Sequence, residues 1–277
     1  MSGRKPMRYR ALALDLDGTL TNTQKTVTPR TREALFLAAS RGVTVILASG
    51  RPVEGMRKMA ELVDLSRLDG YVLACNGASI LRYRDGQMVF CADIPIETIA
   101  ALQPLSARFG VALLGYAGDC VVTNDAANRY AQKEAYNNGL ALEEQADLAR
   151  AIARPIPKLM LVGEPERLAR AAECAKALFS GQLNVFLSES YFLEITPLGI
   201  DKAAGLRRLI DQLGIPREEL IAVGDGLNDI PMLAFAGLGV AMQNAYPETK
   251  AAADAHTLSN DQDGVAEVVR RYILEAI

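Results

Sequence analysis

Short apolar runs alternate with longer amphipathic segments along the first third of the chain. The apolar runs are Arg10–Leu16, Val43–Leu47 and Gly70–Ala74, and their length and composition predict buried strands. The segments between them, Pro29–Arg41 and Val53–Val63, space their apolar residues as a helix does. This alternation predicts a doubly wound parallel sheet, in which ligands bind beyond the carboxyl ends of the strands.

The pattern changes after Ile80. The Asp85-Gly86 pair predicts the turn of a hairpin over Leu81–Ile94. Further strands are predicted at Val111–Tyr116, Cys120–Thr123, Lys158–Val162, Val185–Ser188 and Phe192–Ile195, and helices at Ile96–Phe109 and Glu166–Phe179. This block predicts an inserted α+β domain, with Phe186 and Leu187 in its core and Lys158 solvated.

The alternating pattern returns from Thr196 onward. It predicts helices at Asp201–Leu213, Met232–Ala236 and Gly264–Ala276, and strands at Leu220–Val223 and Leu238–Ala241. The predicted fold is therefore α/β, with a doubly wound parallel-sheet core and an inserted α+β cap domain. We expect the core to comprise residues 1–81 and 196–277, and the cap to comprise residues 82–195.

Composition and charge narrow the class of protein. Half of the 277 residues are apolar and 23% are charged, so the chain can bury a sizeable core. The net charge of −3 lacks the basic excess typical of nucleic-acid-binding proteins, so we expect no such partner. No apolar stretch is long enough to span a membrane, and the basic start MSGRKPMRYR lacks the apolar segment of a signal peptide.

Histidine and cysteine counts exclude further classes. The single histidine, His256, rules out a zinc site built on several histidines, and we expect it to be structural or exposed. The cysteines are far apart in the sequence and form no CxxC pair, which is typical of reduced thiols. We therefore expect a cytoplasmic protein with four reduced, buried thiols, at Cys75, Cys91, Cys120 and Cys174.

Two carboxylates, Asp15 and Asp17, stand where the first predicted strand ends, before Gly18. Clustered carboxylates repel each other unless a cation joins them or one of them is protonated. A hard divalent cation with oxygen ligands, most naturally Mg²⁺, is one explanation of the pair. A solvated turn with the same residues is the other.

Three more polar segments follow a predicted strand or open a predicted helix. The hydroxyl and main-chain N–H groups of Ala48–Arg51 can bind phosphate oxygens, although a plain turn can have this sequence. Lys202 begins a helix, where a lone lysine is usually solvated. The segment Gly224–Asp229 suits either a cation or an Asx turn.

Together, these four segments resemble the motifs of the haloacid dehalogenase-like superfamily of phosphohydrolases, in the same order. The motifs are DLDGTLT, ASGR, Lys202 and GDGLND, and the resemblance covers essentially the whole chain. An insertion between the second and third motifs, preceded by Asn76–Ala78, resembles the Cof-type subfamily with class II, subtype B caps. Ser49 stands where many relatives have threonine. Asp201 stands where they often have serine, and could alter the pairing of Lys202.

The resemblance implies a role for each motif residue. Asp15 would be the nucleophile that forms an aspartyl-phosphate, and Asp17 would act as general acid and base. The Asp15 and Asp225 carboxylates and the Asp17 main-chain carbonyl would hold Mg²⁺, with Asp229 behind them. Arg51 would either help with charge or pair with a structural carboxylate. The implied phosphate-binding residues are Ser49, Gly50, Asn76, Lys202 and Asn228.

The function implied is that of a Mg²⁺-dependent phosphatase acting on small phosphorylated metabolites, sugar phosphates above all. We expect it to work as a monomer or homodimer, with no membrane partner. One alternative is a phosphomutase or phosphotransferase of the same family, which would pass the phosphoryl group to a sugar hydroxyl. The other is a catalytically silent binding or regulatory protein on this fold.

Overall fold

A computed structural model describes residues 9–152 and 156–275. The chain forms two compact units. The core unit comprises the residues up to Gly50, Arg57–Val89 and the residues from Asp201 onward. The cap unit comprises Arg51–Met56 and Phe90–Ile200.

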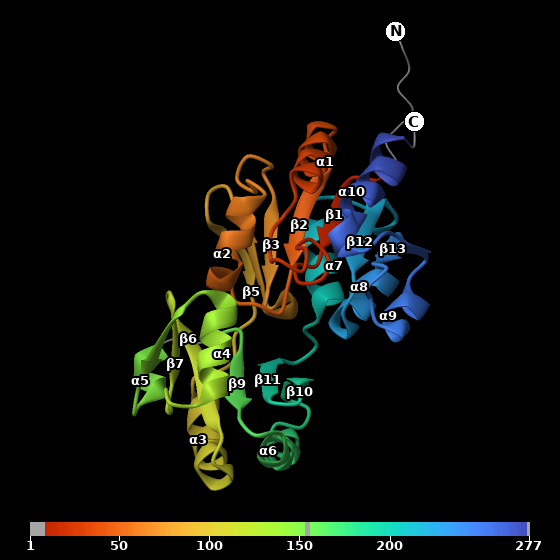
Figure 1. The fold of residues 1–277 in the computed structure, drawn as a ribbon. Coiled ribbons are helices and arrows are strands. Elements are labelled where there is room, and N and C mark those ends of the chain that lie inside the picture. Colours follow the sequence, from red (N-terminus) through yellow and green to blue (C-terminus); the bar gives the residue numbers. More distant parts are fainter. Residues whose placement is uncertain (1–8, 153–155, 276–277) are drawn as a thin grey trace. The chain divides into compact units, whose positions relative to one another are not determined.

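The core unit is built on an eight-stranded sheet in the order β14-β13-β12-β1-β2-β3-β4-β5 (Figure 1). The strands from β14 to β3 run parallel, whereas β4 runs antiparallel to β3. Central strand β1 is fully buried and pairs with β2 and β12. The strands span Ala11–Leu14 (β1), Thr44–Ala48 (β2), Tyr71–Ala74 (β3), Ser79–Arg82 (β4), Gln87–Cys91 (β5), Leu220–Gly224 (β12), Leu238–Ala241 (β13) and Ala255–His256 (β14).

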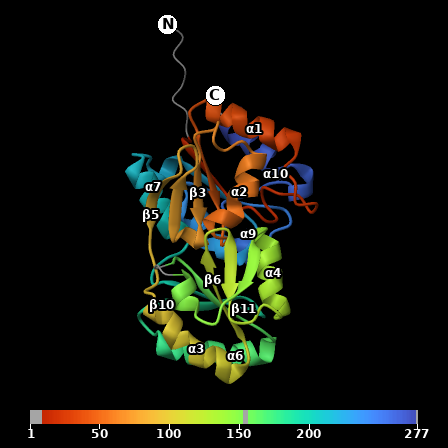
Figure 2. The ribbon, with the colours of Figure 1, turned by 90° about the vertical axis from the view of Figure 1, so that its left-hand side faces the viewer.

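Helices cover both faces of this sheet. Figure 2 shows α7 on one side and α1, α2 and α10 on the other. The helices span Pro29–Ser40 (α1), Val53–Leu62 (α2), Lys202–Gln212 (α7), Ile230–Phe235 (α8), Pro247–Ala252 (α9) and Gly264–Val269 (α10). The sequence explains the start of α1, because Thr28 accepts a hydrogen bond from the Thr31 N–H and Pro29 occupies the first turn. The predicted α/β class of the core is confirmed.

The cap unit has a six-stranded sheet in the order β10-β11-β9-β6-β7-β8, antiparallel except for the β7–β8 pair. Helices α3, α5 and α6 pack on one face of the sheet and α4 on the other. Successive residues of β9 alternate between these two faces. The elements span Glu97–Phe109 (α3), Ala112–Ala117 (β6), Cys120–Thr123 (β7), Arg129–Asn138 (α4), Ala141–Glu144 (β8), Leu148–Ile152 (α5), Leu159–Val162 (β9), Pro165–Leu178 (α6), Leu183–Glu189 (β10) and Phe192–Pro197 (β11).

Some elements differ from the sequence predictions. Strand β1 ends at Leu14 rather than Leu16, and the hairpin of β4 and β5 extends the core sheet. The units divide at Val89/Phe90 and Ile200/Asp201, later than the predicted boundaries after residues 81 and 195. Helix α10 ends at Val269 and continues as a π-helical turn to Leu274, whereas Ala276 lies outside the described residues, as do residues 1–8 at the basic start.

Two predictions about cap side chains are wrong. Lys158 is 2% exposed rather than solvated, and its ammonium lies 3.8 Å from Glu134 and 4.0 Å from Glu194. Leu187 is 42% exposed instead of lying in the cap core. The four cysteines are free thiols, as predicted, but only Cys75 is buried, whereas Cys91 is exposed and Cys120 and Cys174 are half-buried.

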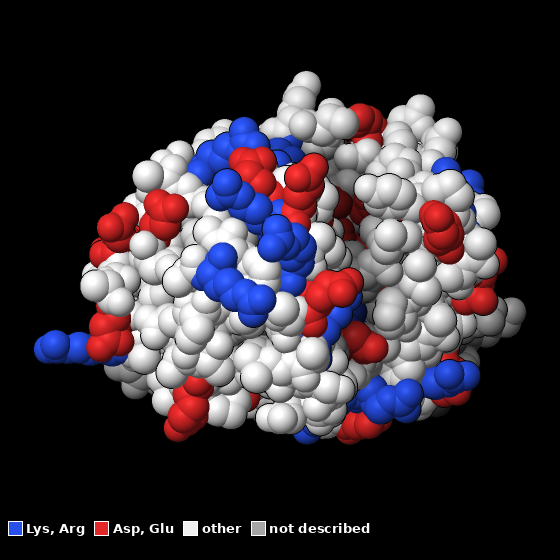
Figure 3. Space-filling view, turned by 90° about the horizontal axis from the view of Figure 1, so that it is seen from below, with Lys and Arg blue, Asp and Glu red and all other residues white. Residues whose placement is uncertain are grey.

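Acidic and basic side chains are interspersed on the molecular face drawn in Figure 3. Among the described residues, no helix has both the length and the apolar character needed to cross a membrane.

Helix α7 approaches the 3-10 turn Cys75–Gly77 so closely that position 205 of the helix requires a glycine. A Cβ atom placed on Gly205 would lie 2.8 Å from the Gly77 Cα and 2.9 Å from the Leu73 Cδ1. Alanine normally stabilises a helix interior by about 1 kcal/mol relative to glycine. At this position, overpacking opposes that gain by about 1–3 kcal/mol.

We therefore expect Gly205→Ala to lower the unfolding free energy, by up to about 2 kcal/mol. Urea unfolding followed by circular dichroism measures the change. The sign of the change in unfolding free energy is the test. If the helix surface were open at this position, the alanine variant would be more stable than the wild type.

Candidate active site

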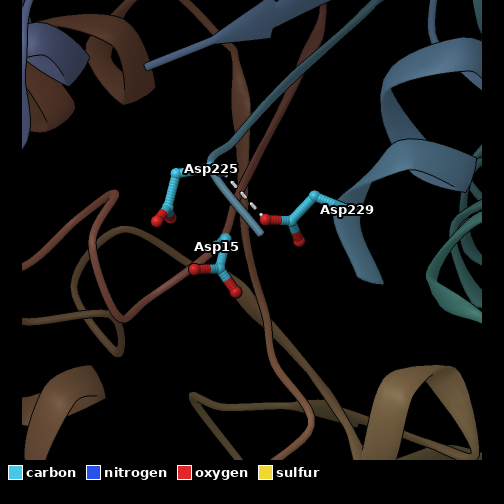
Figure 4. A group of neighbouring side chains, drawn as sticks. All are labelled: Asp15, Asp225 and Asp229. Atoms are coloured by element: carbon cyan, nitrogen blue, oxygen red, sulfur yellow. Dashed lines mark hydrogen bonds between the residues drawn. The ribbon is translucent and has the colours of Figure 1, made fainter. Parts of the chain in front are cut away.

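The ends of two neighbouring strands bring two carboxylates together. Strands β1 and β12 are parallel partners, so Asp15 and Asp225, which follow them, reach the same edge of the sheet. The Asp15 N–H donates to the Val223 carbonyl at 3.0 Å, which fixes the start of its loop. Asp229 joins them from the next turn, and Figure 4 shows the three carboxylates gathered around one small volume. One oxygen of each lies within 4.8 Å of the others.

A buried ammonium group separates two of these carboxylates. Lys202 is 0% exposed, and its Nζ lies 2.6 Å from both Asp15 Oδ1 and Asp229 Oδ1. Burial alone would lower the pKa of Lys202, but the charges of Asp15 and Asp229 outweigh burial and raise it. Lys202 therefore carries a permanent positive charge, in contrast to a solvated lysine at a helix start.

Asp201 does not alter this pairing. Its carboxylate caps α7 by accepting a hydrogen bond from the Ala204 N–H at 2.7 Å. The family resemblance puts serine at this position in many relatives. Serine and aspartate are both favoured at a helix N-cap, so Asp201 is suited to cap α7.

Asp229 is engaged through both of its oxygens. Oδ1 accepts from Lys202, and Oδ2 accepts from the N–H groups of Asp225 at 3.0 Å and Gly226 at 2.9 Å. The side chain is fully buried and holds the loop that carries Asp225. Both oxygens of Asp229 therefore have partners within the protein.

Asp225 and Asp15 each keep one oxygen that forms no hydrogen bond within the described part of the chain. Asp225 Oδ1 accepts from the Thr19 hydroxyl at 2.7 Å, and Asp15 Oδ1 accepts from Lys202. The Oδ2 atoms of both residues remain available to a ligand.

Asp17 lies outside the group of three carboxylates. Its side chain is 39% exposed, and its Oδ1 lies 2.7 Å from the Nζ of Lys25. The two carboxylates of the DxD pair therefore occupy different environments. Sequence reasoning missed Lys25, because a lysine in a polar loop carries no signal that separates it from a solvated one.

The residues expected to bind phosphate lie at neighbouring strand ends of the core. The Asn76 N–H donates to the Ser49 carbonyl at 2.9 Å, and the Asn228 amide donates to Asn76 Oδ1 at 3.2 Å. A Cβ on Gly50 would lie 3.2 Å from the Asn76 amide nitrogen, so only glycine leaves that amide undisturbed. The close approach of Gly77 to the Asp201 carbonyl joins this group to the start of α7 and Lys202.

Two other polar residues, His256 and Arg51, make contacts of their own. His256 is exposed at the sheet edge, with its Nε2 3.1 Å from the Lys250 carbonyl. Arg51 belongs to the cap unit and donates to the Asn137 carbonyl.

Comparison with known proteins identifies the family to which the chain belongs. A sequence profile of haloacid dehalogenase-like hydrolases matches residues 12–269. The chain belongs to this family. A haloacid dehalogenase-like hydrolase from Bacteroides thetaiotaomicron has a similar structure, with a TM-score of 0.91, 40% identity and coverage of 95% of this chain and 99% of that one.

Other members of the family carry phosphatase names. A sugar phosphatase of HAD subclass IIB is similar in structure, with a TM-score of 0.80, 26% identity and coverage of 95% of this chain and 98% of that one. The 5-amino-6-(5-phospho-D-ribitylamino)uracil phosphatase YcsE of Bacillus subtilis is 27% identical, covering 98% of each chain. The predicted enzyme class, a hydrolase of the haloacid dehalogenase-like family, is confirmed, as is the predicted cap subclass.

The charge balance of this haloacid dehalogenase-like site favours a divalent cation. If all three carboxylates were ionised, they and one ammonium would leave two negative charges in a largely buried volume. Burial raises the pKa of Asp15 to about 8, and the Asp229 charge adds to the rise while Lys202 opposes it. Burial also raises the pKa of Asp225 to about 6 against the lowering effect of the Thr19 hydrogen bond. The available carboxylate oxygens are the hard ligands that Mg²⁺ prefers, so the donor set fits this ion.

The raised pKa of Asp15 predicts a pH-dependent stability for the protein without metal. The pKa of Asp15 rises from an ordinary 3.8 to about 8 on folding, so the folded state binds more protons than the unfolded state between these pH values. Stability should therefore fall as the pH rises through this window. Asp15→Asn removes the buried charge and should raise Tm in EDTA at pH 8 by about 4 °C.

The measurement is thermal unfolding in EDTA from pH 5 to pH 8. We expect the Tm difference between Asp15→Asn and the wild type to grow with pH, and saturating Mg²⁺ to reduce it. Asp211→Asn, on the exposed side of α7, is the matched control and should follow the wild type. A Tm difference that stays constant over this range would contradict the buried-charge explanation.

Proposed function

We propose that this haloacid dehalogenase-like hydrolase is a Mg²⁺-dependent phosphatase of small phosphorylated metabolites. The observation that carries the proposal is the state of Asp15. Lys202 fixes one oxygen of this buried carboxylate at 2.6 Å, and the other oxygen has no hydrogen bond among the described residues. A carboxylate held in this way is oriented to act as a nucleophile.

In the first step, one oxygen of Asp15 attacks phosphorus while the bond between phosphorus and the leaving oxygen breaks. Asp17 donates a proton to that oxygen, which leaves as an alcohol. In the second step, Asp17 removes a proton from water, and the water oxygen attacks the phosphorus of the aspartyl-phosphate. The bond between Asp15 and phosphorus breaks, inorganic phosphate is released, and both carboxyl groups return to their initial states.

Donor groups around Asp15 would hold the phosphate during both steps. Lys202 brings a permanent charge, Ser49 a hydroxyl and Gly50 a main-chain N–H beside it. The paired amides of Asn76 and Asn228 are the remaining candidates. These donors meet the negative charge that spreads over the oxygens of the transferred group.

The Asp15 and Asp225 carboxylates and the Asp17 main-chain carbonyl would hold Mg²⁺, while Asp229 orients the loop of Asp225. When bound, the ion neutralises charge between the nucleophile and the phosphate dianion. Asp17 would remain outside the set of carboxylate ligands, because its side chain pairs with Lys25.

Small metabolites, and sugar phosphates above all, are the substrate class that we propose. The supporting likenesses are to a sugar phosphatase and to a phosphatase of a phosphorylated ribitylamino-uracil. Both relatives act on a phosphate carried by a polyhydroxylated chain or ring. This shared chemistry favours the phosphate ester of a polyhydroxylated compound as the substrate.

The test is phosphate release from a panel of phosphorylated sugars, sugar alcohols and nucleotides. We expect hydrolysis with Mg²⁺ and none in EDTA. Asp15→Asn should lower kcat by about 10⁴-fold or more, because an amide cannot form the acyl-phosphate. Asp211→Asn again serves as the control for a carboxylate removed from the same unit.

Hydrolysis that survives Asp15→Asn would contradict the covalent route. Transfer of phosphate to a sugar hydroxyl in place of water, seen by analysis of the products, would favour a phosphomutase. Mg²⁺ binding without turnover of any compound would favour a silent binding protein.

A further inference from the structure

The loop after β1 is tied to a distant part of the core unit by two asparagine side chains. The Asn244 amide donates to the Gly18 carbonyl at 2.8 Å. The Asn260 amide donates to the Thr21 carbonyl at 2.9 Å. Both contacts join residues more than 200 positions apart in the sequence, on the loop that carries Asp17.

The two asparagines also hold each other. Asn244 Oδ1 accepts from the Asn260 N–H at 3.0 Å, so Asn244 uses both ends of its side-chain amide. Asp261 extends the contact by accepting from the N–H and hydroxyl of Thr23 at 2.9 and 3.0 Å. The segment from Thr257 onward therefore binds the loop after β1 at successive points. Asn244 links these hydrogen bonds to the loop after β13.

A hydrogen bond to the Gly18 carbonyl can influence site groups on both sides of the peptide that Gly18 forms with Thr19. Gly18 follows Asp17 directly, has φ of +85°, and would bring a Cβ against the Asp225 carboxylate. Its carbonyl belongs to the peptide that precedes Thr19, whose hydroxyl donates to Asp225 Oδ1 at 2.7 Å. Rotation of this peptide would move the Asp17 main chain on one side and the Thr19 hydroxyl on the other.

We propose that Asn244 and Asn260 are positioning residues that fix the orientation of Asp17 for proton transfer to the leaving group. This inference rests on the proposed phosphatase function. Neither asparagine needs to touch the substrate, because each acts through a main-chain carbonyl of the loop. Asp15 has its own support in Lys202, so the loss of the asparagine contacts should affect proton transfer more than phosphate binding.

The experiment compares leaving groups. An alkyl phosphate such as glycerol 3-phosphate needs its leaving oxygen protonated, whereas p-nitrophenyl phosphate releases a stable phenolate without this help. The value of kcat/KM reports the step in which the leaving group departs. Asn244→Asp preserves the size and the acceptor of Asn244 but turns a carboxylate oxygen toward the Gly18 carbonyl.

We expect Asn244→Asp to lower kcat/KM for glycerol 3-phosphate by about tenfold, since the lost hydrogen bond is replaced by repulsion. Both substrates are measured at saturating Mg²⁺, so that any weaker metal binding is compensated, and for p-nitrophenyl phosphate the loss should stay within about twofold. Asn260→Asp should show the same pattern. Gln243→Glu, an exposed neighbour with the same change of charge, is the matched control and should leave both substrates unaffected.

An equal loss for the two substrates, or no loss for either, would overturn the proposed positioning role. The rate of amide hydrogen exchange of residues 19–23 is a second measurement of how firmly the loop is held, and it does not depend on turnover. Exchange should quicken in Asn244→Asp and not in Gln243→Glu, and unchanged exchange would overturn the inference as well. If the wild type hydrolyses neither these two compounds nor any member of the panel, the phosphatase proposal fails by itself, and exchange alone decides whether the asparagines hold the loop.

Discussion

The contact of Lys202 with Asp15 and Asp229 organises the rest of the site. A fully buried ammonium is very unfavourable unless opposite charges pair with it, and here two carboxylates do so at 2.6 Å. Because Asp229 also binds two main-chain N–H groups, the same contact fixes the loop of Asp225. One ion-pair network therefore sets the positions of the proposed nucleophile Asp15, of the loop that carries Asp225 and of the positive charge of Lys202.

The topology makes this network possible across a long separation in sequence. Lys202 and Asp15 lie 187 residues apart, with the whole cap unit inserted between them. Parallel strands β1 and β12 place their carboxyl ends at one edge, and Gly77 and Gly205 let α7 approach that edge closely. The entropy of closing a loop grows only slowly with its length, so the core tolerates a large insertion at this point.

Sequence patterns predicted the strand-end carboxylates and strands in both units, because buried runs and glycine loops leave clear periodic signals. The pattern alone favoured a solvated Lys202, and only the family resemblance placed it in the site. The sequence patterns did not predict α4, whose buried apolar side chains are only Ala131 and Ala135. Nor did they reveal that Lys158 is buried, since its pairing with Glu134 and Glu194 joins distant elements. Lys25, Asn244 and Asn260 were missed for a related reason. Polar loop residues look solvated until the fold shows which carboxylate or carbonyl they meet.

The different surroundings of Asp15 and Asp17 suit the roles proposed for them. A nucleophile gains from a fixed position and a nearby permanent charge, and Asp15 has both within a buried site. A group that gives up and takes back a proton needs access to the leaving oxygen and to water. Asp17 is partly exposed and pairs with Lys25, while hydrogen bonds from Asn244 and Asn260 hold the main chain of its loop. Two carboxylates one residue apart are thus held by separate means, which lets their protonation differ during the same reaction.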